Sequence, residues 1–173
     1  MDNQVVIQSI ITLFSEAYAG PADPSSTWFI DNEPDSGILS LIAKVSAAEA
    51  SWSTNHDQPG TSIVAHIEHL RWSLTNANRA LAGEPYQGSW KESWHMLNAD
   101  QAAWSSLREE LRKEFETLRE NLQKQKDMPG DYLTGVMALI PHAAYHLGTI
   151  RQQIERARQA ASITTKSKEA DKS

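Results

Sequence analysis

The sequence contains no cysteine, and this absence excludes several kinds of site. Without cysteine the protein has no disulfide framework, no cysteine-ligated zinc, no iron–sulfur cluster and no thiol nucleophile of its own. The Gly-x-Ser-x-Gly turn of a nucleophilic serine and the glycine-rich loop of a phosphate site are also missing from the sequence. Any thiol chemistry would therefore depend on a thiol that arrives with a substrate.

Long hydrophobic runs and basic stretches are also missing. The longest apolar run covers residues 136–140, far short of the roughly 20 residues that a membrane-spanning helix needs, so no contact with a membrane is predicted. Basic residues form no stripe interleaved with aromatic residues, so nucleic-acid binding is not expected. The first lysine or arginine is Lys44, which argues against a secretory signal and predicts a cytoplasmic protein.

The overall composition is that of one soluble domain. A chain of 173 residues, with 40% hydrophobic and 22% charged residues, is long enough to bury a substantial core. The net charge of −6 comes from residues 1–43, which contain acidic residues but no basic one. We expect a single helical domain over residues 1–161. From residue 162 the chain is small, polar and charged, which predicts a disordered tail over residues 162–173.

Apolar residues recur at helical spacing in four long segments, which predict four main helices. The first ends near residue 20, the second begins after Thr61 or Ser62, and the third begins at a capping box formed by Asn98 and Gln101. Asp131 is predicted to cap the last. A shorter helix is expected after Ser36, within the first long connection. Because no segment alternates as a strand does, the predicted fold is an all-α four-helix bundle with one short extra helix.

Histidines are the side chains most suggestive of a site. The six of them are His56, His66, His69, His95, His142 and His146. The last two are four residues apart on one predicted helix, so they lie on the same side and can share one metal ion.

On the second main helix, a rotation of about 100° per residue places one histidine near the apolar face and the other toward solvent. His66 lies about 60° from the centre of that face and His69 about 120° from it, so the first is favoured as the inward side chain. His56 and His95 fall in polar or loop segments and are expected to be solvated. Pro141 precedes His142 inside the last helix, where it is expected to kink the helix.

Three imidazoles from two packed helices leave coordination positions open, as catalytic metal sites do. Zinc, nickel, manganese and iron all accept imidazole, and the sequence does not choose among them. The alternative is a hydrogen-bonded group of histidines at the rim of the core, without a metal ion. The segment after His142 lacks the His-Glu-x-x-His pattern, and Glu92 with His95 forms the one Glu-x-x-His pattern, so neither a gluzincin nor a di-iron site is predicted.

Two segments resemble the signature segments of the DinB-like superfamily, small metalloenzymes built as four-helix bundles. They are residues 63–70 (IVAHIEHL) and residues 142–152 (HAAYHLGTIRQ). The resemblance covers the chain from Ser36 to about Gln159. It implies that His66, His142 and His146 bind one divalent metal ion.

The resemblance further implies a metal-dependent enzyme that acts on a small molecule. Relatives include S-transferases that use a low-molecular-weight thiol and proteins described as hydrolases, and homodimers are common among them. A different reading is a non-catalytic stress or regulatory module whose histidines are structural. Six tryptophans, which require burial, suit either packing of loops on the bundle or a partner surface, and Trp72 lies opposite the apolar face of its helix.

Overall fold

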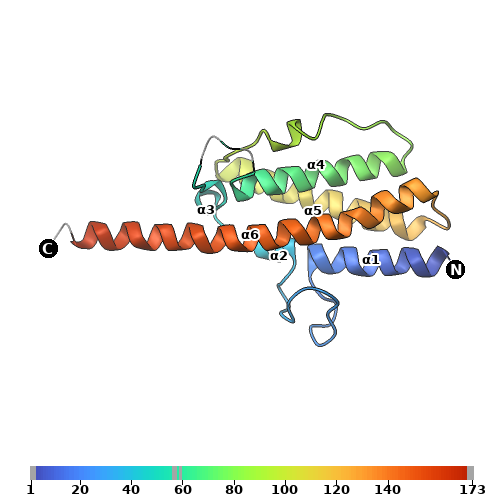
Figure 1. Ribbon diagram of the computed structural model, residues 1–173, viewed down its shortest axis with the longest axis horizontal. Coiled ribbons are helices and arrows are strands. Elements are labelled where there is room, and N and C mark those ends of the chain that lie inside the picture. The colour runs from blue at the N-terminus through green and yellow to red at the C-terminus, as the bar shows by residue number, and fades with distance from the viewer. Residues whose placement is uncertain (1–2, 56–57, 59, 171–173) are drawn as a thin grey trace.

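The computed structural model describes residues 3–55, 58 and 60–170, and these form helices and no strand. The elements are α1 (Asn3–Ala19), α2 (Ile38–Ala43), α3 (Ala47–Ser51), α4 (Ile63–Leu81), the 3₁₀-helix η1 (Glu92–Trp94), α5 (Gln101–Lys124) and α6 (Gly130–Ala170). The four long helices are α1, α4, α5 and α6 (Figure 1). The predicted all-α bundle is therefore confirmed, except that the first connection holds two short helices, α2 and α3, where one was expected.

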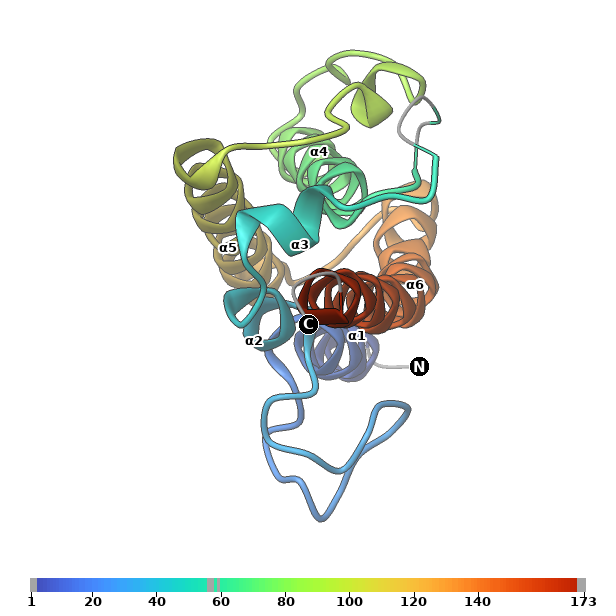
Figure 2. The same cartoon turned by 90° about the vertical axis from the view of Figure 1, so that its left-hand side faces the viewer.

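The four long helices pack around one hydrophobic core. Helix α4 contacts α5 and α6, and α1 contacts the same two helices from the other side. Figure 2, viewed along the bundle, shows these four helices side by side. Fully buried side chains from all four form the core: Phe14, Leu70, Leu74, Leu111, Leu118 and Ile150. Burial of each such side chain contributes roughly 1.5–3 kcal/mol, so the shared core determines how the helices pack.

The starts of α4 and α5 are fixed by side-chain caps. The Ser62 hydroxyl accepts the Ala65 N–H, as the sequence predicted for α4. At α5 the carboxylate of Asp100 accepts the Ala103 N–H at 2.8 Å, so the predicted capping box at Asn98 is wrong. Asparagine and aspartate are almost equal as caps, and the sequence alone does not say which of two such residues, two positions apart, ends the loop.

Helix α6 is longer than the sequence suggested. It begins at Gly130, so the predicted cap at Asp131 is wrong and this residue lies in the first turn. It continues to Ala170, whereas a disordered tail was expected from residue 162, and in Figure 1 it extends well past the other helices. No glycine or proline occurs between residues 149 and 170, and alanine, lysine, glutamine and arginine have high helix propensities. The helix also bends: its N-terminal part runs at an angle to its long C-terminal part (Figure 1), and Pro141 lies inside it.

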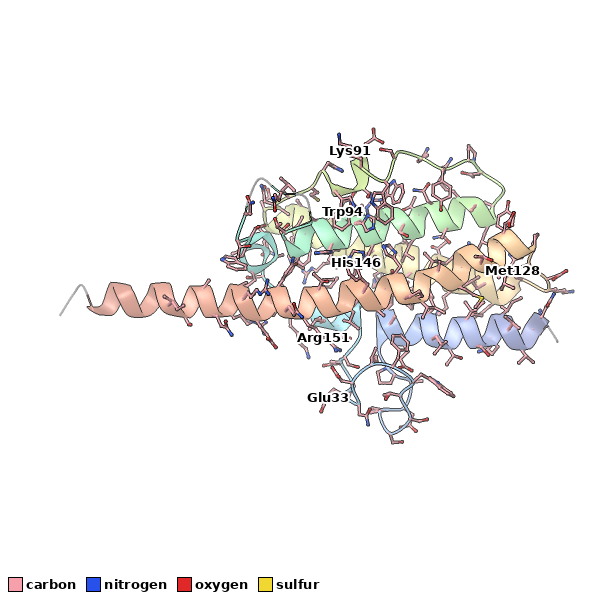
Figure 3. All side chains as sticks on the ribbon, viewed as in Figure 1. Glu33, Lys91, Trp94, Met128, His146 and Arg151 are labelled. Atoms are coloured by element: carbon pink, nitrogen blue, oxygen red, sulfur yellow. The ribbon has the colours of Figure 1, made fainter. Side chains whose placement is uncertain are left out.

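The connection between α1 and α2 is held to the bundle by charged groups. The buried carboxylate of Glu16 accepts the backbone N–H groups of residues 28–30. From α6, the Arg151 guanidinium pairs with Asp31 at 2.6 Å and donates to the Ser36 carbonyl at 2.7 Å (Figure 3). These contacts tie a loop that is rich in proline to two of the long helices.

The short helix α3 is anchored on α6 through Glu49. Its carboxylate accepts hydrogen bonds from Arg158 at 2.8 Å and from the backbone N–H of Ser46, which closes a capping box. These contacts, with the Arg158 side chain first, lower the pKa of Glu49 to about 2. The pair of Glu49 and Arg158 holds α3 close to the C-terminal half of α6.

The connection between α4 and α5, residues 82–100, runs back over α4 (Figure 1). The buried side chain of Asn76 accepts the Gln87 N–H at 2.8 Å and donates to the Gln87 carbonyl at 3.2 Å. The indole N–H of Trp72 donates to the same carbonyl at 3.0 Å, so this half-buried tryptophan packs against the connection between α4 and α5. The Ser62 hydroxyl holds the far end by donating to the Leu97 carbonyl at 2.7 Å.

Candidate metal centre

Four histidines gather between α4 and α6, beneath the α4–α5 connection. His66 and His69 come from α4, and His142 and His146 come from α6. Three of the rings are buried, and that of His142 is half-buried. Trp94 descends from η1 toward the cluster, with its ring centroid 5.8 Å from that of His146 (Figure 3).

The ring nitrogens of three of these histidines converge on one point. The Nε2 atom of His142 lies 3.0 Å from Nε2 of His69 and 3.0 Å from Nε2 of His146. One ligand atom from each of the three lies within 4.8 Å of the others. Two imidazoles on one zinc-sized ion are at most about 4.2 Å apart, twice the usual metal–nitrogen distance, so the spacing suits a shared ion.

A serine fixes the tautomer of His69. The Ser93 hydroxyl donates to the Trp90 carbonyl at 2.7 Å, and Nδ1 of His69 lies 2.7 Å from the same hydroxyl oxygen. Because the single hydroxyl proton is directed at the carbonyl, Nδ1 of His69 is the donor to serine. Its Nε2 therefore carries a lone pair that faces His142.

The convergent nitrogens lack the protons to satisfy one another. Burial, reinforced by the neighbouring histidines, lowers the pKa of His69 to about 3 and that of His146 to about 2, and burial also lowers the pKa of His142. All three rings are therefore neutral at pH 7, with one N–H each. With His69 donating to serine, a hydrogen fits in only one of the two contacts at His142. A cation among the three nitrogens satisfies both contacts at once.

His66 lies behind this group. Its Nδ1 is 2.8 Å from Nδ1 of His146, the nitrogen that faces away from His142, and its Nε2 is buried without a hydrogen-bond partner among the described residues. Burial lowers the pKa of His66 to about 4, and the nearby backbone of Gly60 acts in the opposite direction by raising it. The ring is thus placed to accept a hydrogen bond from Nδ1–H of His146 and hold the orientation of that ring, as outer partners of metal-bound histidines do.

The expectation that His69 faces solvent is wrong, because its side chain is 0% exposed. The α4–α5 connection covers this side of α4, and Trp90 and Trp94 pack on the ring with centroid distances of 4.3 and 4.1 Å. A helical wheel takes account only of the residues of its own helix. The tryptophan-rich loop was the available signal that another segment covers this face.

The other described candidates lie apart from the cluster. His95 is exposed and its Nδ1 contacts the Glu92 carbonyl, while His56 lies outside the described residues. Glu68 is buried next to His69 in the sequence, but both of its oxygens accept hydrogen bonds from Arg71, at 2.7 and 2.6 Å. Within the described ranges, the group that can hold a metal ion is made of imidazole nitrogens alone.

Comparison with known proteins identifies a family for most of this chain. The family model described as the DinB superfamily matches residues 37–154, a segment that includes all four clustered histidines. Neither the curated proteins nor the solved structures contain a match. In the part of the chain that the structure describes, no helix combines the length and the hydrophobicity needed to cross a membrane.

Proposed function

The chain belongs to the DinB superfamily, and from this membership and the histidine cluster we propose that it is a metal-dependent enzyme acting on a small molecule. The observation that carries the proposal is the convergence of three neutral imidazoles whose facing nitrogens lack enough protons to bond one another. A purely structural cluster of histidines is expected to find a hydrogen bond for each buried nitrogen.

We assign the metal to His69, His142 and His146. The set inferred from the sequence was His66, His142 and His146, and the change rests on the positions of the Nε2 atoms. In this arrangement Nδ1–H of His69 donates to Ser93, and Nδ1–H of His146 donates to His66. The donor set accepts zinc, nickel, manganese or iron, so the identity of the metal is left to measurement.

The cluster is covered by tryptophans on one side and accessible on the other, as a catalytic metal site requires. Trp90 and Trp94 exclude water from His69, whereas His142 is half-buried and forms the accessible side of the site. A divalent ion held by three ligands supplies a Lewis acid that either lowers the pKa of a bound water to about 7 or holds a thiolate. Hydrolysis and thiol-dependent S-transfer are the two reaction classes that fit. Because the chain has no cysteine, the transfer reaction requires a low-molecular-weight thiol as cosubstrate.

Metal content tests the proposal directly. Protein purified without a nickel column and analysed by inductively coupled plasma mass spectrometry is expected to hold about one metal ion per chain. His142→Ala and His146→Ala are expected to lose it, together with any activity found in screens of thiol conjugation and ester or amide hydrolysis. Native protein that is metal-free and cannot be loaded, or activity that is unchanged in His146→Ala, would contradict the proposal.

We further propose a cytoplasmic homodimer. Trp28 is 70% exposed and Phe29 is also exposed, both on the connection between α1 and α2, where a second copy can cover them. Light scattering after size exclusion is expected to give a mass twice the 19.3 kDa of one chain. The Trp28→Ser variant is expected to shift toward the mass of one chain. Fractionation of cells tests the location.

The same exposed tryptophan, in an acidic segment, also supports the second candidate function, a non-catalytic interaction module. A stoichiometric partner protein that is recovered equally well from native and His146→Ala protein, and lost with Trp28→Ser, would favour this module over the enzyme.

A further inference from the structure

A cleft separate from the histidine cluster lies in the groove between α4 and α6. Its volume is about 230 Å³. Its walls are apolar and built from small and aliphatic residues: Ala77, Ala80 and Leu81 of α4, and Gly135, Val136 and Leu139 of α6. A cavity of about 150 Å³ is enough for one benzene ring, so this cleft has room for one ring with a short chain.

The cleft and the histidine cluster occupy the same groove. Leu139 precedes His142 by three residues, which is about 4.5 Å along α6, and Gly135 precedes it by two turns on the same face. On α4, Ala80 follows His69 by about three turns and also shares its face. The cleft therefore lies along the same groove as the cluster, on the N-terminal side of His142 in α6.

The mouth of the cleft favours positive charge. Two exposed tyrosines, Tyr86 and Tyr132, stand there with Asp131, whose carboxylate makes no hydrogen bond or ion pair within the described part of the chain. No lysine or arginine among the described residues lines the cleft. The nearby Arg79 is already paired with Glu84 at 2.9 Å. Aromatic faces next to a free carboxylate attract ammonium groups and disfavour anions.

We propose that this cleft binds a small organic cation that has an apolar ring or short alkyl body. The body lies between Ala77 and Gly135, and the ammonium group faces Asp131 and the two tyrosines. Binding by the cleft does not depend on the metal. Its use as the part of the active site that holds the remote end of the substrate rests on the proposed function.

Gly135 offers a variant that fills the cleft without disturbing the fold. A Cβ atom added there would meet no atom of another element within 4 Å, and leucine is a better helix former than glycine. Gly135→Leu is therefore expected to fold at least as well as the native protein while its side chain occupies the cleft. Ala138→Leu, an exposed position on the same turn of α6 that does not line the cleft, is the matched control.

The test is a nuclear magnetic resonance titration at pH 7.4 with three probes of similar shape: 2-phenylethylamine, 2-phenylethanol and 3-phenylpropionate. The amine is expected to bind in the millimolar range and several-fold more tightly than the alcohol, with the anion weakest. Gly135→Leu is expected to weaken amine binding roughly tenfold or more, Ala138→Leu to leave it unchanged, and Asp131→Asn to remove the preference for the amine. Equal binding of the three probes, or amine binding that persists in Gly135→Leu, overturns the proposal.

The same titration on native protein treated with a chelator separates this inference from the proposed function. Amine binding that survives removal of the metal, or that occurs in protein unable to hold one, supports the cleft even if the metal centre fails. Protein that binds its metal ion but shows no amine binding refutes the cleft and leaves the metal centre standing.

Discussion

Exchanging each histidine of α4 for asparagine should distinguish the proposed metal ligand, His69, from its proposed outer partner, His66. An asparagine side chain reaches about as far as Nδ1 of histidine but not as far as Nε2. His69→Asn therefore keeps a hydrogen bond to Ser93 and removes the nitrogen that faces His142. His66→Asn retains an oxygen that can accept the Nδ1–H of His146. The two variants make the same chemical change eight-tenths of a helical turn apart.

The expected losses differ by at least an order of magnitude. Structural zinc sites with four ligands bind with about 10–16 kcal/mol, or about 2.5–4 kcal/mol for each ligand. His69→Asn should therefore weaken metal binding by roughly 10²- to 10³-fold. Removal of an outer partner costs about 10- to 100-fold, so His66→Ala should fall in that range and His66→Asn, which keeps the hydrogen bond, should lose less than about tenfold.

Competition with a chromophoric zinc chelator measures the affinities, and far-ultraviolet circular dichroism with thermal unfolding confirms that each variant is folded. His146→Ala provides the reference for loss of a ligand. If His66→Asn lost as much affinity as His146→Ala while His69→Asn kept that of the native protein, the assignment from the Nε2 positions would be refuted and the set inferred from the sequence would be right.

Three further predictions concern the fold. Because the folded-state pKa of Glu49 is depressed to about 2, its stabilising contribution is present above about pH 4.5 and is lost as the pH falls toward 2. In urea titrations, the free energy of unfolding should therefore fall less between pH 4.5 and pH 2 in Glu49→Gln than in the native protein, and an unchanged pH profile would contradict this. Trp104→Phe should lower the free energy of unfolding by about 2–4 kcal/mol in the same assay, since it leaves a cavity and removes the 2.8 Å hydrogen bond from the buried indole to the Val45 carbonyl. A decrease below about 1 kcal/mol would refute the reasoning. Glu16→Gln should speed amide hydrogen exchange at residues 28–30 with little effect on the core helices, and equal exchange in both proteins would show that the carboxylate does not hold the loop.

The helical architecture follows from the sequence because it depends on local periodicity. Ile63, Ile67, Leu70 and Leu74 recur on one face of α4, and all four are fully buried, since a helix with such a face must pack it against other helices. The spacing of His142 and His146 likewise fixes their common side on α6 without reference to any other segment. Local signals are weaker at boundaries, as the cap of α5 at Asp100 shows.

The placement of His69, the proposed third ligand, was decided by tertiary structure. A wheel drawn for α4 alone turns His69 toward solvent, but residues 82–100 fold back over that face and bury it. The hydroxyl of Ser93, more than twenty residues away in the sequence, then sets its tautomer. Periodicity records which side of a helix is apolar, whereas the position of a metal ligand depends on the angle between two helices and on the loop that covers them. Those depend on contacts between segments distant in the chain, which no local pattern encodes.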